Sequence, residues 1–143
     1  PGAKINSFEL KKALGELFIY PVSGRLTSPY GLRNDPFTGK RRMHYGIDMA
    51  NSTGTPVRAT LDGKVSMCGY SSVYGKYIII KHQGGYQSLY AHLDKYRVRE
   101  GETIYQNQII GDMGNTGRST GSHLHFSIYY NQKPIDPVSV LGR

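Results

Sequence analysis

Short β-prone runs, divided by turn-forming residues about every ten positions, dominate the sequence from Tyr20 onward. The runs are rich in Val, Ile, Thr and Tyr, while Gly, Pro, Asn and Ser stand between them. Eighteen glycines in 143 residues require many tight turns. No convincing helical stripe separates the runs, which argues against βαβ units. We therefore expect an all-β fold, built as an antiparallel sheet or sandwich.

The expected strands follow from the richest of these runs. They are Val57–Ala59, Lys64–Cys68, Tyr77–His82, Tyr86–His92, Thr103–Tyr105, Ile109–Met113 and His123–Tyr130. Gly84 and Gly85 lie between two of them, and this placement predicts a β-hairpin. The single cysteine, Cys68, cannot form an intramolecular disulfide and is expected to pack as a small buried side chain.

A chain of this length can bury one adequate hydrophobic core, so we expect one catalytic unit. We expect residues 20–143 to be that unit and residues 1–19 to be an N-terminal extension or the end of an upstream linker. Asn6 and Glu9 predict the cap of a short N-terminal helix, whose apolar positions would be Leu10, Leu14, Leu17 and Phe18. The chain begins Pro-Gly without Met, so we expect a processed product or an excised piece. The lack of a signal peptide therefore leaves the compartment open.

The net charge of +8, from 18 Lys and Arg against 10 Asp and Glu, favours contact with polyanions. An anionic envelope surface is one such partner, and good solubility alone is the alternative. The basic residues are spread along the chain and form no long run. We therefore expect no nucleic-acid partner.

His123 and His125 are two of the five histidines and stand two residues apart in an expected strand. Residues two apart in a strand point to the same face, about 7 Å from each other, so both imidazoles project together. A Gly-rich turn, residues 114–122, leads directly into the pair. The arrangement suits a metal ligand beside a proton-transfer group, although the residues alone leave open which histidine is the ligand. Two surface histidines are the alternative.

His44 and Asp48 form a second candidate pair. Zinc bonds to imidazole nitrogen and carboxylate oxygen are about 2 Å long, so both side chains would have to converge on one point. In a straight strand, residues four apart are separated by about 13 Å, so convergence requires a bend, which Gly46 permits. One carboxylate and two histidines are a plausible catalytic zinc set with a position left for water. The alternative is a surface histidine and an unrelated turn aspartate.

The other two histidines have different expectations. His92 ends a strand-like run at an expected turn, and an imidazole at such a position could face a cleft. The alternative is that His92 has a capping or packing role. His82 ends a run that reads as a buried strand, beside the expected hairpin turn, and we expect it to be structural.

These motifs together resemble the lysostaphin-like, or LytM-like, zinc endopeptidases of bacterial cell walls. The resemblance runs from about Tyr20 to Leu141, in the family's order. Its pieces are Ser28–Arg33 with Asp35-Pro36, the His-x-x-x-Asp of His44 to Asp48, Gly54–Ala59, Tyr74-Gly75, Tyr90–Leu93, Gly114–Gly117 with Ser119–Gly121, and the His-x-His of His123 to His125. Ser122 stands where many relatives have proline, and Asn107 where many have a turn glycine; neither change removes a reactive group.

The resemblance implies a fold and a set of roles. The fold is that of the lysostaphin-type peptidases, of the duplicated hybrid motif kind. The metal ligands would be His44, Asp48 and His125, which hold one Zn²⁺ per chain. His92 and His123 would be the two catalytic histidines beside a metal-bound water, with their individual tasks undecided.

The resemblance also implies a substrate, which is the stem peptides or cross-links of peptidoglycan, with a D,D-endopeptidase favoured. Loops around residues 34–42 and 71–75 would line a groove for an extended peptide, and the expected substrate-binding residues are Asn34, Tyr45, Tyr74 and Tyr90. For the tyrosines, packing is the alternative. We expect a monomer in the cell envelope, periplasmic or extracellular. The alternative function is a non-catalytic or latent peptidoglycan-binding or activator module on the same fold.

Overall fold

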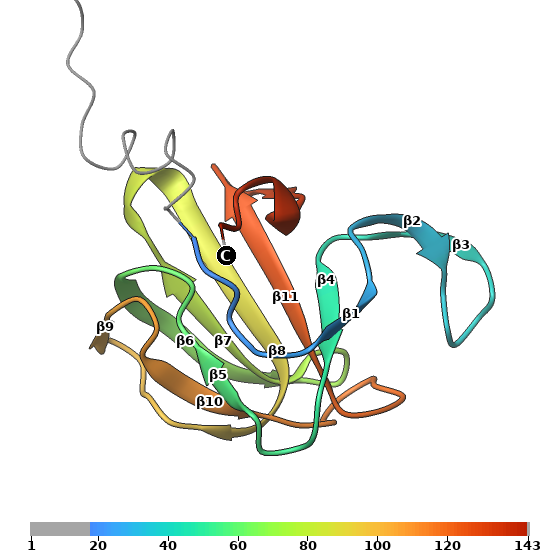
Figure 1. Cartoon of the computed structure of the whole chain (residues 1–143), viewed down its shortest axis with the longest axis horizontal. Helices are drawn as coiled ribbons and strands as arrows, with labels where there is room; N and C mark the ends of the chain where they lie inside the picture. The colour runs from blue at the N-terminus through green and yellow to red at the C-terminus, as the bar shows by residue number, and fades with distance from the viewer. Residues whose placement is uncertain (1–17, 143) are drawn as a thin grey trace, which may run out of the picture.

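The computed structural model describes residues 18–142, and its regular structure is almost entirely β (Figure 1). In chain order the elements are β1 (Arg25–Ser28), β2 (Gly31–Asn34), β3 (Arg41–His44), β4 (Ile47–Ala50), β5 (Pro56–Arg58), β6 (Gly63–Ser71), β7 (Gly75–Lys81), η1 (Gln83–Gly85), β8 (Tyr86–Tyr96), β9 (Thr103–Ile104), β10 (Ile109–Met113), β11 (His123–Tyr130), β12 (Lys133–Ile135) and η2 (Pro137–Ser139). No helix in this part of the chain is long and apolar enough to cross a membrane. The expected all-β class is confirmed. The expected N-terminal helix lies outside the described residues, except for Phe18.

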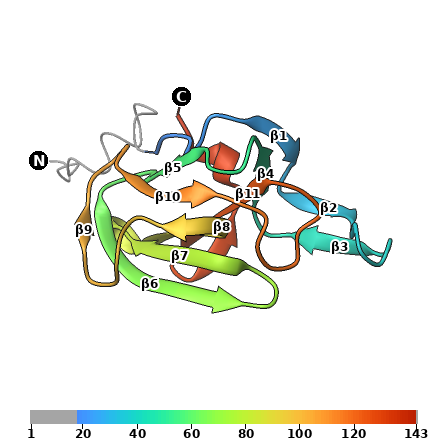
Figure 2. The same cartoon turned by 90° about the horizontal axis from the view of Figure 1, so that it is seen from below.

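One large antiparallel sheet organises the domain, with strand order β1-β4-β11-β8-β7-β6-β9. β12 adds to β11, and β5 pairs with β10. A separate two-stranded sheet, β2-β3, projects from one side of the molecule (Figures 1 and 2). The predicted hairpin joins β7 to β8, with Gly84 and Gly85 in its turn at positive φ values of 74° and 83°. Glycine adopts this left-handed conformation without the strain that a side chain would cause.

The long strand β8 belongs to two parts of the sheet. From Tyr86 to Ala91 it pairs with β11, and from Leu93 onward it pairs with β10. The register of β8 against β7 shifts around His92, and its register against β10 shifts between Leu93 and Lys95; at each shift β8 has one residue more than its partner. Such a β-bulge bends a strand and redirects the side chain at the bulge. The bend carries β8 from the main sheet to the β5-β10 ribbon.

The hydrophobic core contains side chains from the main sheet and from the β5-β10 ribbon. Its largest fully buried members are Tyr90, Phe18, Phe126, Ile47, Met49, Ile78, Ile80, Leu93, Ile104, Ile110 and Met113. Phe18 forms a parallel bridge with Leu141, so the two ends of the described chain meet at the core. Cys68 is only partly buried and packs against this core.

His82 has the structural role expected from the sequence. Its Nδ1 lies 2.7 Å from the carbonyl oxygen of Asp62, and its Nε2 lies 2.7 Å from Ser88 Oγ. Ser88 Oγ in turn lies 2.8 Å from the hydroxyl of Tyr90, which accepts a hydrogen bond from Thr60 N. Burial lowers the pKa of His82 from 6.5 to about 4, although the Asp62 carbonyl opposes this shift.

Acid should therefore weaken the fold through His82. Between pH 6.5 and about 4 the unfolded histidine binds a proton that the folded one does not, so the free energy of unfolding falls as the pH falls through this window. Through this shift in pKa, His82 contributes up to about 3 kcal/mol to the free energy of unfolding at neutral pH, and acid removes this contribution. We expect His82→Gln to reduce this acid sensitivity, measured by urea unfolding at pH 7 and pH 4.5 with chelator present in both samples. Equal acid sensitivity of the wild type and the variant would contradict this role of His82.

Candidate active site

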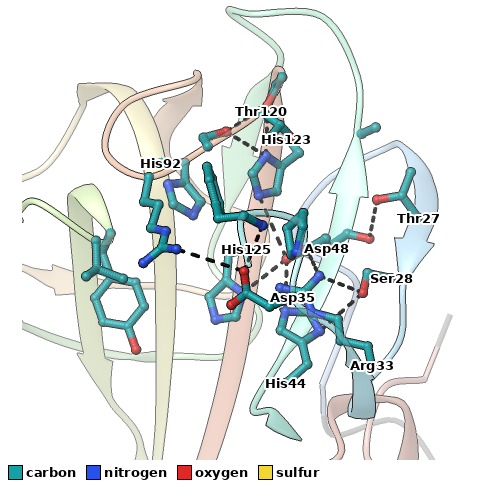
Figure 3. Close-up of a pocket in the computed structure, with 18 of the residues that line it drawn as sticks. Thr27, Ser28, Arg33, Asp35, His44, Asp48, His92, Thr120, His123 and His125 are labelled. Carbon is teal, nitrogen blue, oxygen red and sulfur yellow. Dashed lines mark hydrogen bonds and ion pairs between the residues drawn. The ribbon is translucent and has the colours of Figure 1, made fainter. Parts of the chain in front are cut away.

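A groove of about 520 Å³ lies between the β2-β3 sheet and the main sheet, and all four of the histidines singled out as reactive line it (Figure 3). They are His44, His92, His123 and His125, and Asp48 lines the same groove. In contrast, His82 does not line it. The structure therefore brings together side chains from four different strands.

The register of β4 and β11 makes Asp48 and His125 neighbours. In this antiparallel pair the two residues are direct partners. Side chains of direct partners share one face of the sheet, with Cβ atoms about 5 Å apart. Asp48 Oδ1 accordingly lies 3.1 Å from His125 Nδ1. His123, two residues earlier on the same face, has its Nε2 3.9 Å from Asp48 Oδ1.

His44 reaches this pair from the smaller sheet. β3 ends at His44, and β4 begins three residues later in the main sheet, so the chain bends between the two elements. His44 Nε2 lies 3.2 Å from His125 Nδ1 and 3.3 Å from Asp48 Oδ1. The bend that the sequence analysis required between His44 and Asp48 is present.

These three ligand atoms fit a zinc ion. Their separations are 3.1, 3.2 and 3.3 Å. Zinc bonds of about 2.0–2.1 Å in a tetrahedral arrangement place ligand atoms about 3.3 Å from one another. All three residues are buried. Among the described residues, they are the group of His, Cys, Asp and Glu side chains whose ligand atoms lie close enough together to hold one metal ion. The donor set of two imidazoles and one carboxylate is also one that zinc prefers.

The partners of the remaining polar atoms orient the ligands. His44 Nδ1 lies 2.9 Å from the carbonyl oxygen of Pro29, which can only accept, so the hydrogen is on Nδ1 and the lone pair on Nε2 faces the metal position. His125 Nε2 lies 2.9 Å from Ser127 Oγ, on the side away from that position. Asp48 Oδ2 accepts a hydrogen bond from Arg33 Nη1 at 3.2 Å. Only Oδ1 of Asp48 therefore faces the histidines.

The protonation states suit a metal. Burial raises the pKa of Asp48, but its contacts with His125 and His44 outweigh burial and hold that pKa well below the ordinary value. Burial lowers the pKa of His125, an effect that Asp48 partly opposes. An ionised carboxylate and a neutral imidazole are the forms that bind zinc, so proton competition at these two residues is weak near neutral pH.

His92 enters the groove because of the bulge in β8. Its φ is 66°, a left-handed value that is uncommon for a residue other than glycine. Its backbone N–H donates to the carbonyl of Tyr74 at 2.8 Å, and its Nδ1 donates to the carbonyl of Thr116 at 2.7 Å. Thr116 is itself fixed, since its hydroxyl donates to the carbonyl of Leu93 and accepts from Lys76 N. This network holds the strained backbone and leaves Nε2 of His92 unprotonated.

His123 is held in a similar way. Its Nδ1 lies 2.8 Å from the carbonyl oxygen of Gly121 and 3.1 Å from Ser119 Oγ. The carbonyl again assigns the hydrogen to Nδ1, so in the neutral ring the lone pair is on Nε2. The rings of His92 and His123 lie 4.7 Å apart between centroids. Two imidazoles with free Nε2 atoms are thus placed together beside the proposed metal ligands. Burial lowers the pKa of His92 to about 4, so this ring is neutral near pH 7.

The expected substrate-binding residues divide into two groups. Tyr45 and Tyr74 line the groove, and the Tyr74 ring stacks on His125 with centroids 5.9 Å apart. The expectation for Tyr90 is wrong: the side chain is fully buried in the core, and its hydroxyl is used by Thr60 N. Asn34 does not line the groove either. It is exposed on β2, where successive side chains point to opposite faces and it is the neighbouring Arg33 that faces Asp48.

Several groove residues were not assigned a role from the sequence. The guanidinium groups of Arg33, Arg42 and Arg118 line the groove, as do Asp35 and Phe37. Arg33 belongs to the quoted motif around residues 28–33, and that motif was the available signal for it. Asp35, Phe37 and Arg42 belong to the loop of residues 34–42, which was expected to line the groove. Arg118 lies outside that loop, and its position depends on how two loops meet across the groove.

Gly46 is required for space at this site. A Cβ added there would lie 2.5 Å from the carbonyl oxygen of Phe126 and 2.7 Å from Cε1 of His125. We expect Gly46→Ala to lower the free energy of unfolding by about 1–3 kcal/mol and zinc affinity by roughly 10-fold to 100-fold. Competition with a chromogenic chelator measures the affinity. The matched control is Gly121→Ala, where an added Cβ has no neighbour within 4 Å. Equal zinc affinity of the two variants would contradict the expectation.

The antiparallel β domain with its His-Asp-His cluster defines the class of the protein, which is a zinc metallopeptidase domain. More particularly, the chain belongs to peptidase family M23, whose family model matches residues 42–137. The matched segment contains all five of the residues to which the sequence analysis gave metal-binding or catalytic roles.

Similar proteins include bacterial peptidases. The chain is 44% identical to the DD-carboxypeptidase/endopeptidase Mpg of Neisseria meningitidis serogroup B, over 83% of this chain and 27% of that protein. Among solved structures, a zinc-containing peptidase from Vibrio cholerae has a TM-score of 0.79 at 37% identity, with 89% of this chain and 40% of that chain covered. The catalytic domain of the antimicrobial peptidase lysostaphin from Staphylococcus simulans has a TM-score of 0.73 at 36% identity, with 80% and 90% covered. The chain thus spans about a quarter of the length of the curated relative.

Proposed function

We propose that this domain is a zinc endopeptidase that hydrolyses peptide bonds in the stem peptides or cross-links of bacterial peptidoglycan, with D,D bonds as its targets. The observation that carries the proposal is the presence of three metal-type ligands and two further histidines in one groove. The substrate is inferred from relatives, since a protein 44% identical to this chain is named a DD-carboxypeptidase/endopeptidase and one 39% identical is named a peptidoglycan DD-endopeptidase. We propose that residues 20–143 act as one catalytic unit.

In this proposal His44, Asp48 and His125 hold the zinc ion. When bound, zinc supplies a Lewis acid that polarises the scissile carbonyl and makes water more acidic. The buried carboxylate of Asp48 balances part of the ion's charge, and Arg33 keeps the second carboxylate oxygen turned away from the histidines.

The proposed catalytic residues are His92 and His123. Each has its hydrogen on Nδ1, fixed by a backbone carbonyl, so each offers an unprotonated Nε2 to the groove. One Nε2 would accept the proton of the attacking water. Once that proton has passed to the Nε2 of the other histidine, this ring would donate a hydrogen bond to the oxyanion and deliver the same proton to the leaving amine. Because these steps need no covalent protein intermediate, the groove requires no serine or cysteine nucleophile.

The site of action would be the cell envelope, where peptidoglycan is found, and the domain would act there as a monomer. The net charge of +8 supports contact with an anionic envelope surface. Contact with such a surface would raise the local concentration of the enzyme near its polymeric substrate.

The test is release of soluble product from purified peptidoglycan by the zinc-loaded chain, with mass analysis of the fragments. We expect muropeptide fragments whose masses correspond to cleaved D,D cross-links, with no release after chelation and recovery when zinc is restored. Binding to the walls without any release from several wall chemotypes, with one zinc per chain, would overturn the proposal in favour of a non-catalytic or latent binding module.

A further inference from the structure

The groove carries more positive charge than the proposed metal site requires. Three arginines, Arg33, Arg42 and Arg118, line it, and the acidic residues among its lining are Asp35 and Asp48. Arg33 is paired with Asp48. Asp35 is therefore the carboxylate that remains for two guanidinium groups, and a bound divalent cation would add further positive charge.

Asp35 is largely occupied by its own loop. Its Oδ1 accepts hydrogen bonds from the backbone N–H groups of Phe37 at 2.8 Å and Thr38 at 3.1 Å. Its Oδ2 lies 3.4 Å from Arg42 Nη1. The nearest nitrogen of Arg118, Nη2, lies 3.9 Å from Oδ1, which is an ion-pair distance and too long for a hydrogen bond. Figure 3 shows Asp35 at this place in the groove.

Arg118 is held in place with its donors unused. Its guanidinium carbon lies 4.3 Å from the centroid of the Phe37 ring, which is a cation–π contact across the groove. Its backbone N–H donates to the carbonyl of Val73 at 3.0 Å and so fixes the loop. Within residues 18–142 the side chain has no hydrogen-bond acceptor, and it is 41% exposed. A guanidinium in this state presents N–H groups in the geometry that matches a carboxylate.

We propose that Arg118, supported by Phe37, is the receptor for a free carboxylate of the substrate peptide beside the scissile bond. The inference rests on the proposed function and deepens it, because it selects among peptidoglycan bonds. Stem peptides that retain free carboxylates would bind, whereas neutral glycine bridges and stem peptides with amidated carboxylates would lose this contact. Asp35 marks where a carboxylate approaches the guanidinium in the free protein.

The test compares two synthetic D,D-cross-linked stem-peptide dimers that differ in one feature, the carboxylates near the scissile bond being free in one and carboxamides in the other. We expect the zinc-loaded wild type to prefer the free acid by about tenfold in kcat/KM, mainly through KM. In Arg118→Gln this preference should disappear, because the loss falls on the acid dimer. The matched control, Arg99→Gln, removes an equal charge from an exposed residue outside the groove and should keep the preference.

Three results would overturn the proposal. They are equal kcat/KM for both dimers in the wild type, an equal loss for both dimers in Arg118→Gln, and loss of the preference in Arg99→Gln, which would indicate a general charge effect. If the wild type cleaves neither dimer, the proposed hydrolysis fails, and calorimetry of dimer binding to the zinc-loaded chain tests the receptor separately. Tighter binding of the acid dimer that is lost in Arg118→Gln supports the receptor; equal affinities, or no binding, overturn it.

Discussion

Replacing His125 with alanine is expected to empty the zinc site and to slow peptide-bond hydrolysis by about 10³-fold or more. The variant loses one of the three proposed ligands, whose ligand atom lies 3.2 Å from that of His44 and 3.1 Å from that of Asp48. A Lewis-acidic metal contributes several kcal/mol of transition-state stabilisation, and each 1.36 kcal/mol corresponds to a tenfold change in rate. Metal analysis after gel filtration gives the zinc content, and initial rates on purified peptidoglycan give the activity.

The control for this experiment is another histidine. His82→Gln changes a histidine that lies outside the groove, so it should retain one zinc per chain and most of the activity at neutral pH. Circular dichroism of His125→Ala separates loss of the metal from loss of the fold. A folded His125→Ala variant that keeps one zinc per chain and hydrolyses at the wild-type rate would show that the metal, if present, is held elsewhere.

The sequence predicted the long strands because their side chains carry the signal of burial. Each of the expected runs, such as Tyr77–His82 and Tyr86–His92, overlaps an observed strand, although β6 and β8 extend further than expected. The missed strands β1 to β4 and β12 are three or four residues long. β1 is mostly exposed, and β3 begins with two exposed arginines, so neither strand shows clear apolar alternation. Pairing with neighbouring strands holds them, and that pairing is not visible in the sequence.

The site was predictable in its residues but not in its geometry. The spacing of His123 and His125 places both on one face of a strand, yet it cannot show which of them is opposite Asp48. That depends on the register of β4 against β11, which pairs Asp48 with His125. The entry of His92 depends on a bulge at which β8 has one residue more than β7. Strand partners and registers are long-range properties, so local sequence patterns do not determine them.

The same limit explains the wrong expectation for Tyr90. It stands two residues before His92, and in a regular strand the two side chains would share a face. The bulge interrupts that alternation, so His92 faces the groove while Tyr90 is directed into the core. The contact of Arg118 with Phe37 was equally invisible, because it joins two loops that are 81 residues apart in the chain.

Replacing His123 with alanine should give a different result from replacing His125, since the fold and the zinc should remain while hydrolysis falls. His123 Nε2 lies 3.9 Å from Asp48 Oδ1, and in the proposed function it acts on protons and not on the metal. A positioned proton-transfer group contributes roughly 10²-fold to 10⁴-fold. We therefore expect kcat to fall by about that factor, with one zinc per chain and little change in KM. Stopped-assay kinetics on a cross-linked dimer, together with metal analysis, measures all three quantities.

The double variant His92→Ala/His123→Ala tests whether the two rings act in one proton-transfer step. If the two rings act together in one proton-transfer step, losing the second should cost far less than losing the first, because groups that act as a unit are strongly non-additive. Their centroids are 4.7 Å apart and each is oriented by its own backbone carbonyl, so removing one ring leaves the support of the other intact. Multiplicative losses would indicate two independent tasks, and a loss of zinc in His123→Ala would mean that this histidine, and not only His125, binds the metal.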